Sequence, residues 1–188
     1  MALSTGKIHG LIMMLGLGWL LPLGVLSARY MKHRPDSFWF TLHKYFQLSG
    51  VLVAIIGFSI AVKNFDVFHD DHSRTSYQHG VMGVVTFTLV LLQPLVAFMR
   101  PHKPEGEPAQ VSVSVNRYWW EMAHKSCGYL ILLLAFVTII LGAKMEGTNW
   151  VCAYIFGVVG SLLVLMGLMW FDRFSYQPPV DVVTSDVV

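Results

Sequence analysis

The sequence has few charged residues and almost no cysteine. Charged residues make up 13% of the 188 positions, and the net charge is only +2. The charged share is about half of that in soluble domains. So small a net charge, without a basic run, does not indicate nucleic-acid binding, and we predict no nucleic-acid partner. Two cysteines provide no disulfide framework, and the sequence has no Cys-x-x-Cys-His motif for covalent haem attachment.

The chain instead contains long runs of apolar residues. Hydrophobic residues make up 55% of the chain, and uninterrupted runs of this kind are typical of membrane-spanning helices. We therefore predict an all-α integral membrane protein, a bundle of five transmembrane helices. The predicted spans are Ile8–Ala28, Phe38–Val62, His79–Met99, Tyr118–Gly142 and Trp150–Phe171. Residues 1–172 form the predicted membrane domain, and residues 173–188 a disordered tail.

The basic residues predict the orientation of the spans. Nine of the thirteen lie where odd spans end and even spans begin, and the other four lie on the opposite side. The nine are Arg29, Lys32, Arg34, Lys44, Arg100, Lys103, Arg117, Lys125 and Arg173. Because lysine and arginine concentrate in cytoplasmic loops, we predict that the N-terminus is outside or lumenal and that the C-terminal tail is cytoplasmic.

Four of the eight histidines lie in the spans, one in each of the first four. They are His9, His43, His79 and His124, and each lies near the N-terminal end of its span. Since neighbouring spans run antiparallel, His9 and His79 should lie near the outer face, and His43 and His124 near the cytoplasmic face. The pattern thus predicts two histidine pairs at two depths.

Small residues follow each histidine on its own helical face. Glycines stand seven residues after His9 and His43 and four residues after His79 and His124, spacings that keep to one face of a helix. These glycines are Gly16, Gly50, Gly83 and Gly128, and the same faces continue with Gln47, Ala54, Gly57, Thr86, Gln93, Ala97, Ala135, Thr138 and Gly142. The pattern predicts a furrow for a flat ligand that stands between helices.

Haem is the flat ligand that this arrangement favours. Two neutral imidazoles on facing helices can fill both axial positions of a haem iron, which leaves no position for oxygen and favours electron transfer. Non-covalent attachment means haem b, so we predict two b haems, one near each face. Two alternatives remain open: furrows of small residues also serve plain helix packing, and intramembrane histidines also form proton relays.

Several motifs, in order and with matching spacing, resemble the cytochrome b561 superfamily, in particular the core of the type fused to an extracellular DOMON domain. They are "KIHG", "ARYMK", "WFTLHKYFQ", "HGVMG", "LLQPLVAFMRP" and "YWWEMAHKSCGY", within residues 7 to 172. The resemblance implies two b haems, one bound by His9 with His79 and one by His43 with His124. It also implies electron transfer from cytoplasmic ascorbate to monodehydroascorbate or a ferric chelate outside.

The chain departs from this family form because no domain and no additional helix precede His9. A second hypothesis follows, in which the chain is an electron-relay module for a separate extracellular haem or DOMON domain. A third hypothesis is a proton-coupled transporter that uses the histidines as a relay. Besides the lipid bilayer, the chain could also contact a second copy of itself, because Gly157 and Gly160 could support a homodimer.

Charged and aromatic residues beside the histidines complete the candidate site. Lys44 and Lys125 each directly follow a cytoplasmic-side histidine, and we predict that they extend to the membrane surface and contact a haem propionate or an anionic donor. Further cytoplasmic candidates for a donor site are Arg29, His33, Arg34, Arg100 and Arg117, and the outer loop holds a possible ferric-iron cluster of His69, Asp70, Asp71 and His72. The aromatic residues Trp39, Phe40, Tyr118, Trp119 and Trp120 are predicted interface anchors, and Cys127 a core residue.

Overall fold

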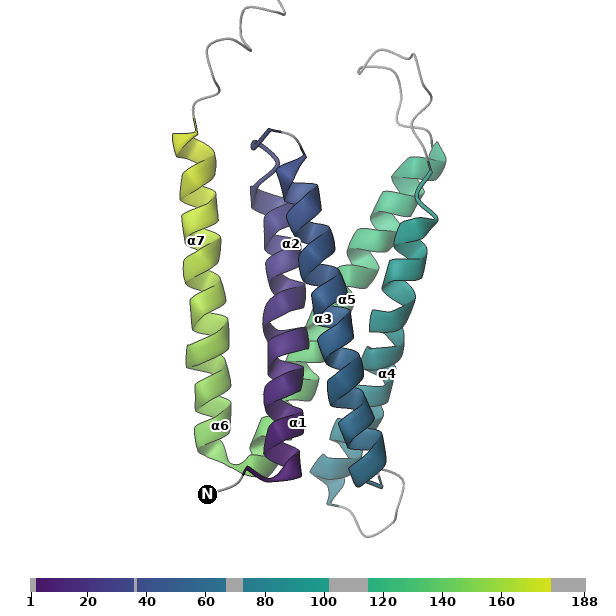
Figure 1. Cartoon of the computed structure of the whole chain (residues 1–188), viewed down its shortest axis with the longest axis vertical. Coiled ribbons are helices and arrows are strands. Elements are labelled where there is room, and N and C mark those ends of the chain that lie inside the picture. Colours follow the sequence, from purple (N-terminus) through teal and green to yellow (C-terminus); the bar gives the residue numbers. More distant parts are fainter. Residues whose placement is uncertain (1–2, 36, 67–72, 102–114, 177–188) are drawn as a thin grey trace, which may run out of the picture.

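Five long helices form the part of the protein that the computed structural model describes, which is residues 3–35, 37–66, 73–101 and 115–176. Each is long and apolar enough to cross a membrane, and the described residues contain no strand, so the predicted helical fold is confirmed (Figure 1). The elements are α1 Thr5–Met13, η1 Met14–Leu20, α2 Leu21–Tyr30, α3 Phe38–Asn64, α4 Arg74–Phe98, α5 Val115–Glu146, α6 Thr148–Cys152, η2 Ala153–Val159 and α7 Gly160–Ser175.

The spans extend a few residues beyond the predicted apolar runs because polar residues begin and end the helices. Ser4 caps α1 by accepting a hydrogen bond from the Lys7 amide, and Ser73 caps α4 in the same way from the Ser76 amide. Helix α7 continues to Ser175, three residues into the segment predicted as a tail. The predicted iron cluster at His69–His72 lies outside the described residues.

Two of the five spans contain a wider, π-helical stretch. In the first span, η1 ends two residues before Pro22, which has no amide hydrogen and crowds the turn before it. In the fifth span, η2 carries the buried Tyr154. The two stretches meet at Gly18, where an added Cβ would lie 3.3 Å from the Tyr154 ring. A glycine at position 18 therefore lets the fifth span approach the first.

The first span and α3 form one tightly packed antiparallel pair. A Cβ added to Gly16 would lie 3.1 Å from the Gly50 carbonyl oxygen, and one added to Gly50 would lie 2.6 Å from the Leu21 side chain. Ala54 beside them is completely buried. The prediction that Gly16, Gly50 and Ala54 border a ligand furrow was therefore wrong, because these small residues let two helix backbones approach each other.

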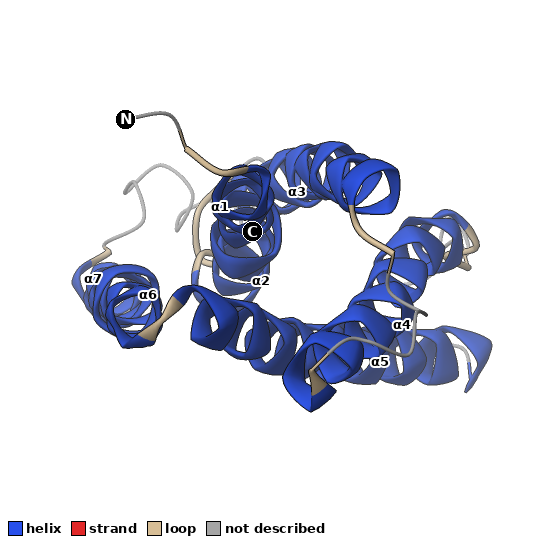
Figure 2. Cartoon of the chain, turned by 90° about the horizontal axis from the view of Figure 1, so that it is seen from below, coloured by secondary structure: helices blue, strands red, loops and turns tan. Residues whose placement is uncertain are grey.

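Helices α4 and α5 form the second antiparallel pair. The buried hydroxyl groups of Thr86 and Thr138 lie 3.3 Å apart and join the two helices by a hydrogen bond. The rings of Phe58 on α3 and Phe87 on α4 stack with centroids 3.9 Å apart, so an aromatic contact connects the first pair to the second. Figure 2 shows the two pairs facing each other, with α6 and α7 at the edge of the bundle beside α1 and α2.

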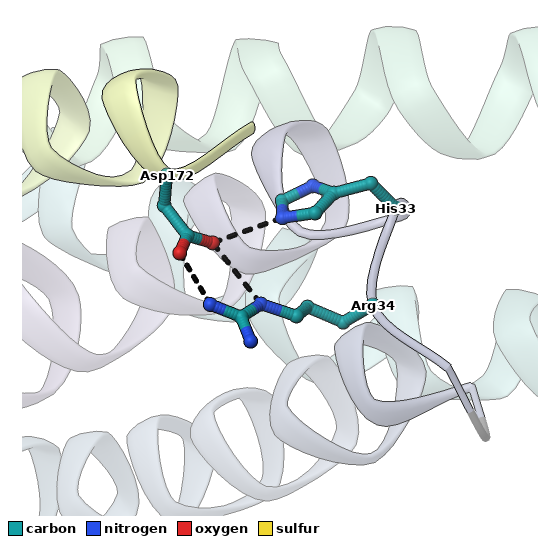
Figure 3. A network of polar contacts seen from close by, with 3 residues as sticks. All are labelled: His33, Arg34 and Asp172. Carbon is teal, nitrogen blue, oxygen red and sulfur yellow. Dashed lines mark hydrogen bonds and ion pairs between the residues drawn. The ribbon is translucent and has the colours of Figure 1, made fainter. Parts of the chain in front are cut away.

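A polar cluster of His33, Arg34 and Asp172 connects the end of α7 to the segment between α2 and α3 (Figure 3). Asp172 accepts hydrogen bonds from His33 Nε2 at 2.9 Å and from Arg34 Nε at 3.1 Å, and it forms an ion pair with the Arg34 guanidinium. The carboxylate raises the pKa of Arg34 above its ordinary value, so the guanidinium stays charged. The sequence predicts His33 and Arg34 as candidates for a donor site. In the structure, both side chains instead contact Asp172 in the fifth span.

Replacing Asp172 by asparagine should loosen this attachment by a small amount. Exposed ion pairs contribute little to stability, so we expect the melting temperature in detergent to fall by roughly 1–3 °C. The decrease should disappear in 1 M salt, which screens exposed charges. Thermal melts at low and high salt measure it, with Arg173→Gln on the same helix as the control. An equal decrease at both salt concentrations would contradict an electrostatic attachment.

Candidate functional site

Four histidines from four different spans meet in two pairs. The rings of His9 on α1 and His79 on α4 have centroids 6.2 Å apart and planes at 84°. Those of His43 on α3 and His124 on α5 have centroids 6.4 Å apart and planes at 76°. Each histidine lies in the N-terminal half of its span, so the antiparallel arrangement separates the pairs along the bundle. Each pair also joins the first helix pair to the second.

Three of the four imidazoles are oriented by hydrogen bonds to the backbone of a neighbouring helix. The Nδ1 atom of His9 lies 2.8 Å from the Gly57 carbonyl oxygen, and that of His43 lies 2.8 Å from the Gly24 carbonyl oxygen. A carbonyl oxygen can only accept, so Nδ1 must carry the proton. In a neutral imidazole this leaves the lone pair on Nε2, which is the form that binds a metal.

His79 on the second helix pair is also oriented by a hydrogen bond from Nδ1 to a backbone carbonyl. Its Nδ1 donates to the Thr138 carbonyl oxygen at 3.0 Å. The ring lies directly on α5, because a Cβ added to Gly142 would come within 2.8 Å of His79 Cε1 and 3.1 Å of Nδ1. Gly142 thus provides the space for the His79 ring, a role that the furrow prediction did not assign to it.

His124 differs from the other three histidines. Among the residues that the structure describes, its buried Nδ1 has no hydrogen-bond partner. Its ring instead stacks on Trp120, with centroids 5.2 Å apart and planes 6° apart. Trp120 in turn donates from Nε1 to the Val96 carbonyl oxygen at 2.8 Å. The aromatic pattern predicts Trp120 only as an interface anchor, although its position four residues before His124 places both on one helical face.

The donor set fits a haem better than a bare metal ion. Imidazole nitrogens bind first-row metals at about 2 Å, so two rings on opposite sides of one ion have centroids about 6 Å apart. Both pairs have this separation. Within residues 3–35, 37–66, 73–101 and 115–176, no three His, Cys, Asp or Glu side chains gather as a metal site. Each pair thus offers two imidazoles, which is the ligand set of a bis-histidine haem.

The two lysines that directly follow His43 and His124 have different surroundings. The Lys44 ammonium group lies 4.8 Å from the centroid of the Phe40 ring. Lys125 forms an ion pair with Glu121, one turn earlier on α5, at 2.9 Å. Both lysines were predicted to contact a propionate or a donor. Lys44 is the better candidate for contact with a propionate or a donor, because Lys125 already has a carboxylate partner.

The remaining basic candidates are distributed unevenly around the same end of the bundle. The Arg100 guanidinium lies over two aromatic rings, 5.6 Å from the Phe40 centroid and 5.9 Å from the Trp120 centroid. Arg117 contacts Glu121 at 3.5 Å. Arg100 thus lies beside the stacked rings of Trp120 and His124.

The fold and the paired imidazoles define a class, the multi-pass membrane proteins with bis-histidine sites at two depths. The sequence profile of eukaryotic cytochrome b561 matches residues 8–151. The chain belongs to the eukaryotic cytochrome b561 family. Membership places it among haem b-binding proteins of transmembrane electron transfer, which are oxidoreductases.

The matches to similar proteins cover less than half of those proteins. A cytochrome b561, DM13 and DOMON domain-containing protein of Arabidopsis thaliana is 36% identical over 74% of this chain, and the match covers 15% of that protein. A cytochrome b561 and DOMON domain-containing protein of the same plant is 32% identical over 87% of this chain and 39% of its own length. Ferric-chelate reductase 1 of Homo sapiens is 26% identical over 76% of this chain and 23% of its own length. No solved structure gave a significant match.

Proposed function

We propose that this chain carries electrons across a membrane through two b haems, one bound by His9 and His79 and the other by His43 and His124. The observation that supports the proposal most directly is the pair of ring separations, 6.2 Å and 6.4 Å. Haem b, when bound between two imidazoles, supplies one-electron chemistry without an open coordination position. The excess of basic residues beside the His43–His124 pair supports a cytoplasmic position for that pair.

The protein's own residues prepare these sites in two ways. Hydrogen bonds from Nδ1 to backbone carbonyls hold His9, His43 and His79 in the tautomer and orientation that a metal needs. Apolar side chains such as Phe87 and Ile131 are buried between the helices and keep water out of the bundle. A dry, preorganised site reduces the rearrangement that accompanies a change of charge.

The electron donor in this proposal is ascorbate, which binds on the cytoplasmic side near Lys44. Ascorbate is an anion at neutral pH, and Lys44 is a cation that contacts an aromatic ring and no carboxylate among the contacts described. The acceptor on the opposite side is a ferric chelate or monodehydroascorbate. The name of the human relative, ferric-chelate reductase 1, supports the first of these.

The test is a reduced-minus-oxidised absorption spectrum of the purified chain in lipid vesicles, with haem quantified per polypeptide. We expect two b haems per chain, reduced by ascorbate from the Lys44 side and reoxidised by an impermeant ferric chelate from the other side. Lys44→Ala should slow reduction by ascorbate several-fold and weaken its salt dependence, whereas Lys125→Ala should have little effect. Absence of haem after expression with haem supplied would refute the proposal.

A second candidate is an electron-relay module for a separate extracellular DOMON domain. The two plant relatives carry such a domain by name, and this chain spans only part of their length. In that case the purified chain would be reduced by ascorbate but would pass electrons to ferric chelates slowly. Ferric reduction by the chain alone at the rate of whole membranes would exclude this candidate. The proton-coupled transporter gains no support from the family.

A further inference from the structure

The two histidine pairs are not equivalent in their hydrogen bonding. In the outer pair, both His9 and His79 donate from Nδ1 to a backbone carbonyl. In the cytoplasmic-side pair, His43 does so but His124 does not, and its Nδ1 is buried without a partner among the described residues. A buried polar atom without a partner is costly, so another contact must hold the His124 ring in this position.

Trp120 is that contact. Its indole ring lies nearly parallel to the His124 imidazole, at 6°, with centroids 5.2 Å apart. The indole cannot turn away easily, because Nε1 donates to the Val96 carbonyl on α4 at 2.8 Å and the Arg100 guanidinium lies over the ring at 5.9 Å. The orientation of His124 is therefore set by a stacked ring that is itself bonded across the α4–α5 pair.

The missing hydrogen bond has a consequence for the metal that His124 would bind. A hydrogen bond from the second nitrogen of a ligating imidazole to an acceptor makes the ligand more basic. A more basic ligand stabilises ferric iron relative to ferrous iron. A ligand without that bond therefore raises the reduction potential. Trp120 holds the His124 ring in the orientation in which Nδ1 is buried without an acceptor among the described residues, and so maintains this state.

We propose that Trp120 is a positioning residue for His124 and that it makes the cytoplasmic-side haem easier to reduce by holding His124 in an orientation in which Nδ1 has no hydrogen-bond acceptor. The inference rests on the proposed binding of haem by His43 and His124. It concerns the reduction potential and the ligand orientation, which can be measured apart from turnover.

The experiment compares Trp120→Leu, Trp120→Phe and the control Trp119→Leu with the unchanged chain. Trp119 is the neighbouring indole, it is 65% exposed, and its ring contacts Tyr118. Redox titration followed by absorption measures both potentials, and electron paramagnetic resonance of the ferric protein reports the orientation of the axial ligands at each haem.

For Trp120→Leu we expect the ratio of reduced to oxidised cytoplasmic-side haem, at a fixed potential, to fall about tenfold, which corresponds to about 59 mV for one electron. The ferric resonance of that haem should shift, and the outer haem should not change. Selective loss of the cytoplasmic-side haem, with recovery in Trp120→Phe, would equally support the proposal. Trp120→Phe retains a stacked ring but loses the hydrogen bond to the Val96 carbonyl, so it should change clearly less than Trp120→Leu. Trp119→Leu should resemble the unchanged chain.

Three results would overturn the inference. The first is an unchanged potential and resonance in Trp120→Leu. The second is an equal change at both haems, which would indicate a general disturbance of the bundle. The third is a Trp120→Phe variant that behaves like Trp120→Leu, because the stacked ring would then not be the cause. If the unchanged chain binds no haem at all, the proposed function fails instead, so the two failures are distinguishable.

Discussion

Replacing any one of the four intramembrane histidines by alanine should reduce the haem content from two per chain to one, and the four variants should form two classes. His9→Ala and His79→Ala should retain the same haem, and His43→Ala and His124→Ala should retain the other. The reason is geometric: each haem needs two axial imidazoles, and the rings pair across the bundle as His9 with His79 and His43 with His124.

Haem quantification and difference spectra of the four purified variants measure this result. His33→Ala is the matched control, because His33 is also a partly buried histidine but bonds to Asp172 and should leave both haems in place. The remaining haem should respond differently in the two classes. Variants that keep the His43–His124 haem should still be reduced rapidly by ascorbate, whereas the other two should be reduced slowly. Four different residual spectra, or unchanged haem content, would contradict the pairing.

Gly142→Ala should remove or strongly weaken the outer haem even though position 142 provides no ligand. The new methyl group would lie 2.8 Å from His79 Cε1, which is closer than unbonded atoms tolerate, and 3.1 Å from Nδ1, which is a tight contact. The His79 ring would have to move away from α5 and would lose its hydrogen bond to the Thr138 carbonyl. Loss of a contact that orients a metal ligand typically costs 10- to 100-fold in affinity, and we expect an effect of about this size on the outer haem.

The control for this prediction is Gly167→Ala on α7, where an added Cβ would meet nothing within 4 Å. Glycine is a weaker helix former than alanine by roughly 1 kcal/mol, so the control should be neutral or slightly stabilising. Titration of the haem-depleted variants with haem, followed by absorption, compares the two sites. Wild-type affinity at both sites in Gly142→Ala would show that the His79 ring does not depend on this glycine.

The sequence by itself determined the number of spans and the depth of each histidine. Apolar runs long enough to cross a bilayer must become helices, because no other local structure satisfies the backbone in lipid. The depth of His9 or His124 then follows from its distance to the end of its run, and antiparallel neighbours place alternate histidines at opposite faces. These properties depend only on position along the chain, which the sequence contains completely.

Only the tertiary structure decided which side chain meets which neighbour. Helical spacing places Gly16 and Gly142 on histidine-bearing faces, yet Gly16 packs against the backbone of α3 while Gly142 makes room for the His79 ring. In the same way, Lys125 pairs with Glu121, and Trp120 stacks on His124. Periodicity gives the face of a helix on which a residue lies, but the rotation and separation of packed helices depend on side chains from several spans together.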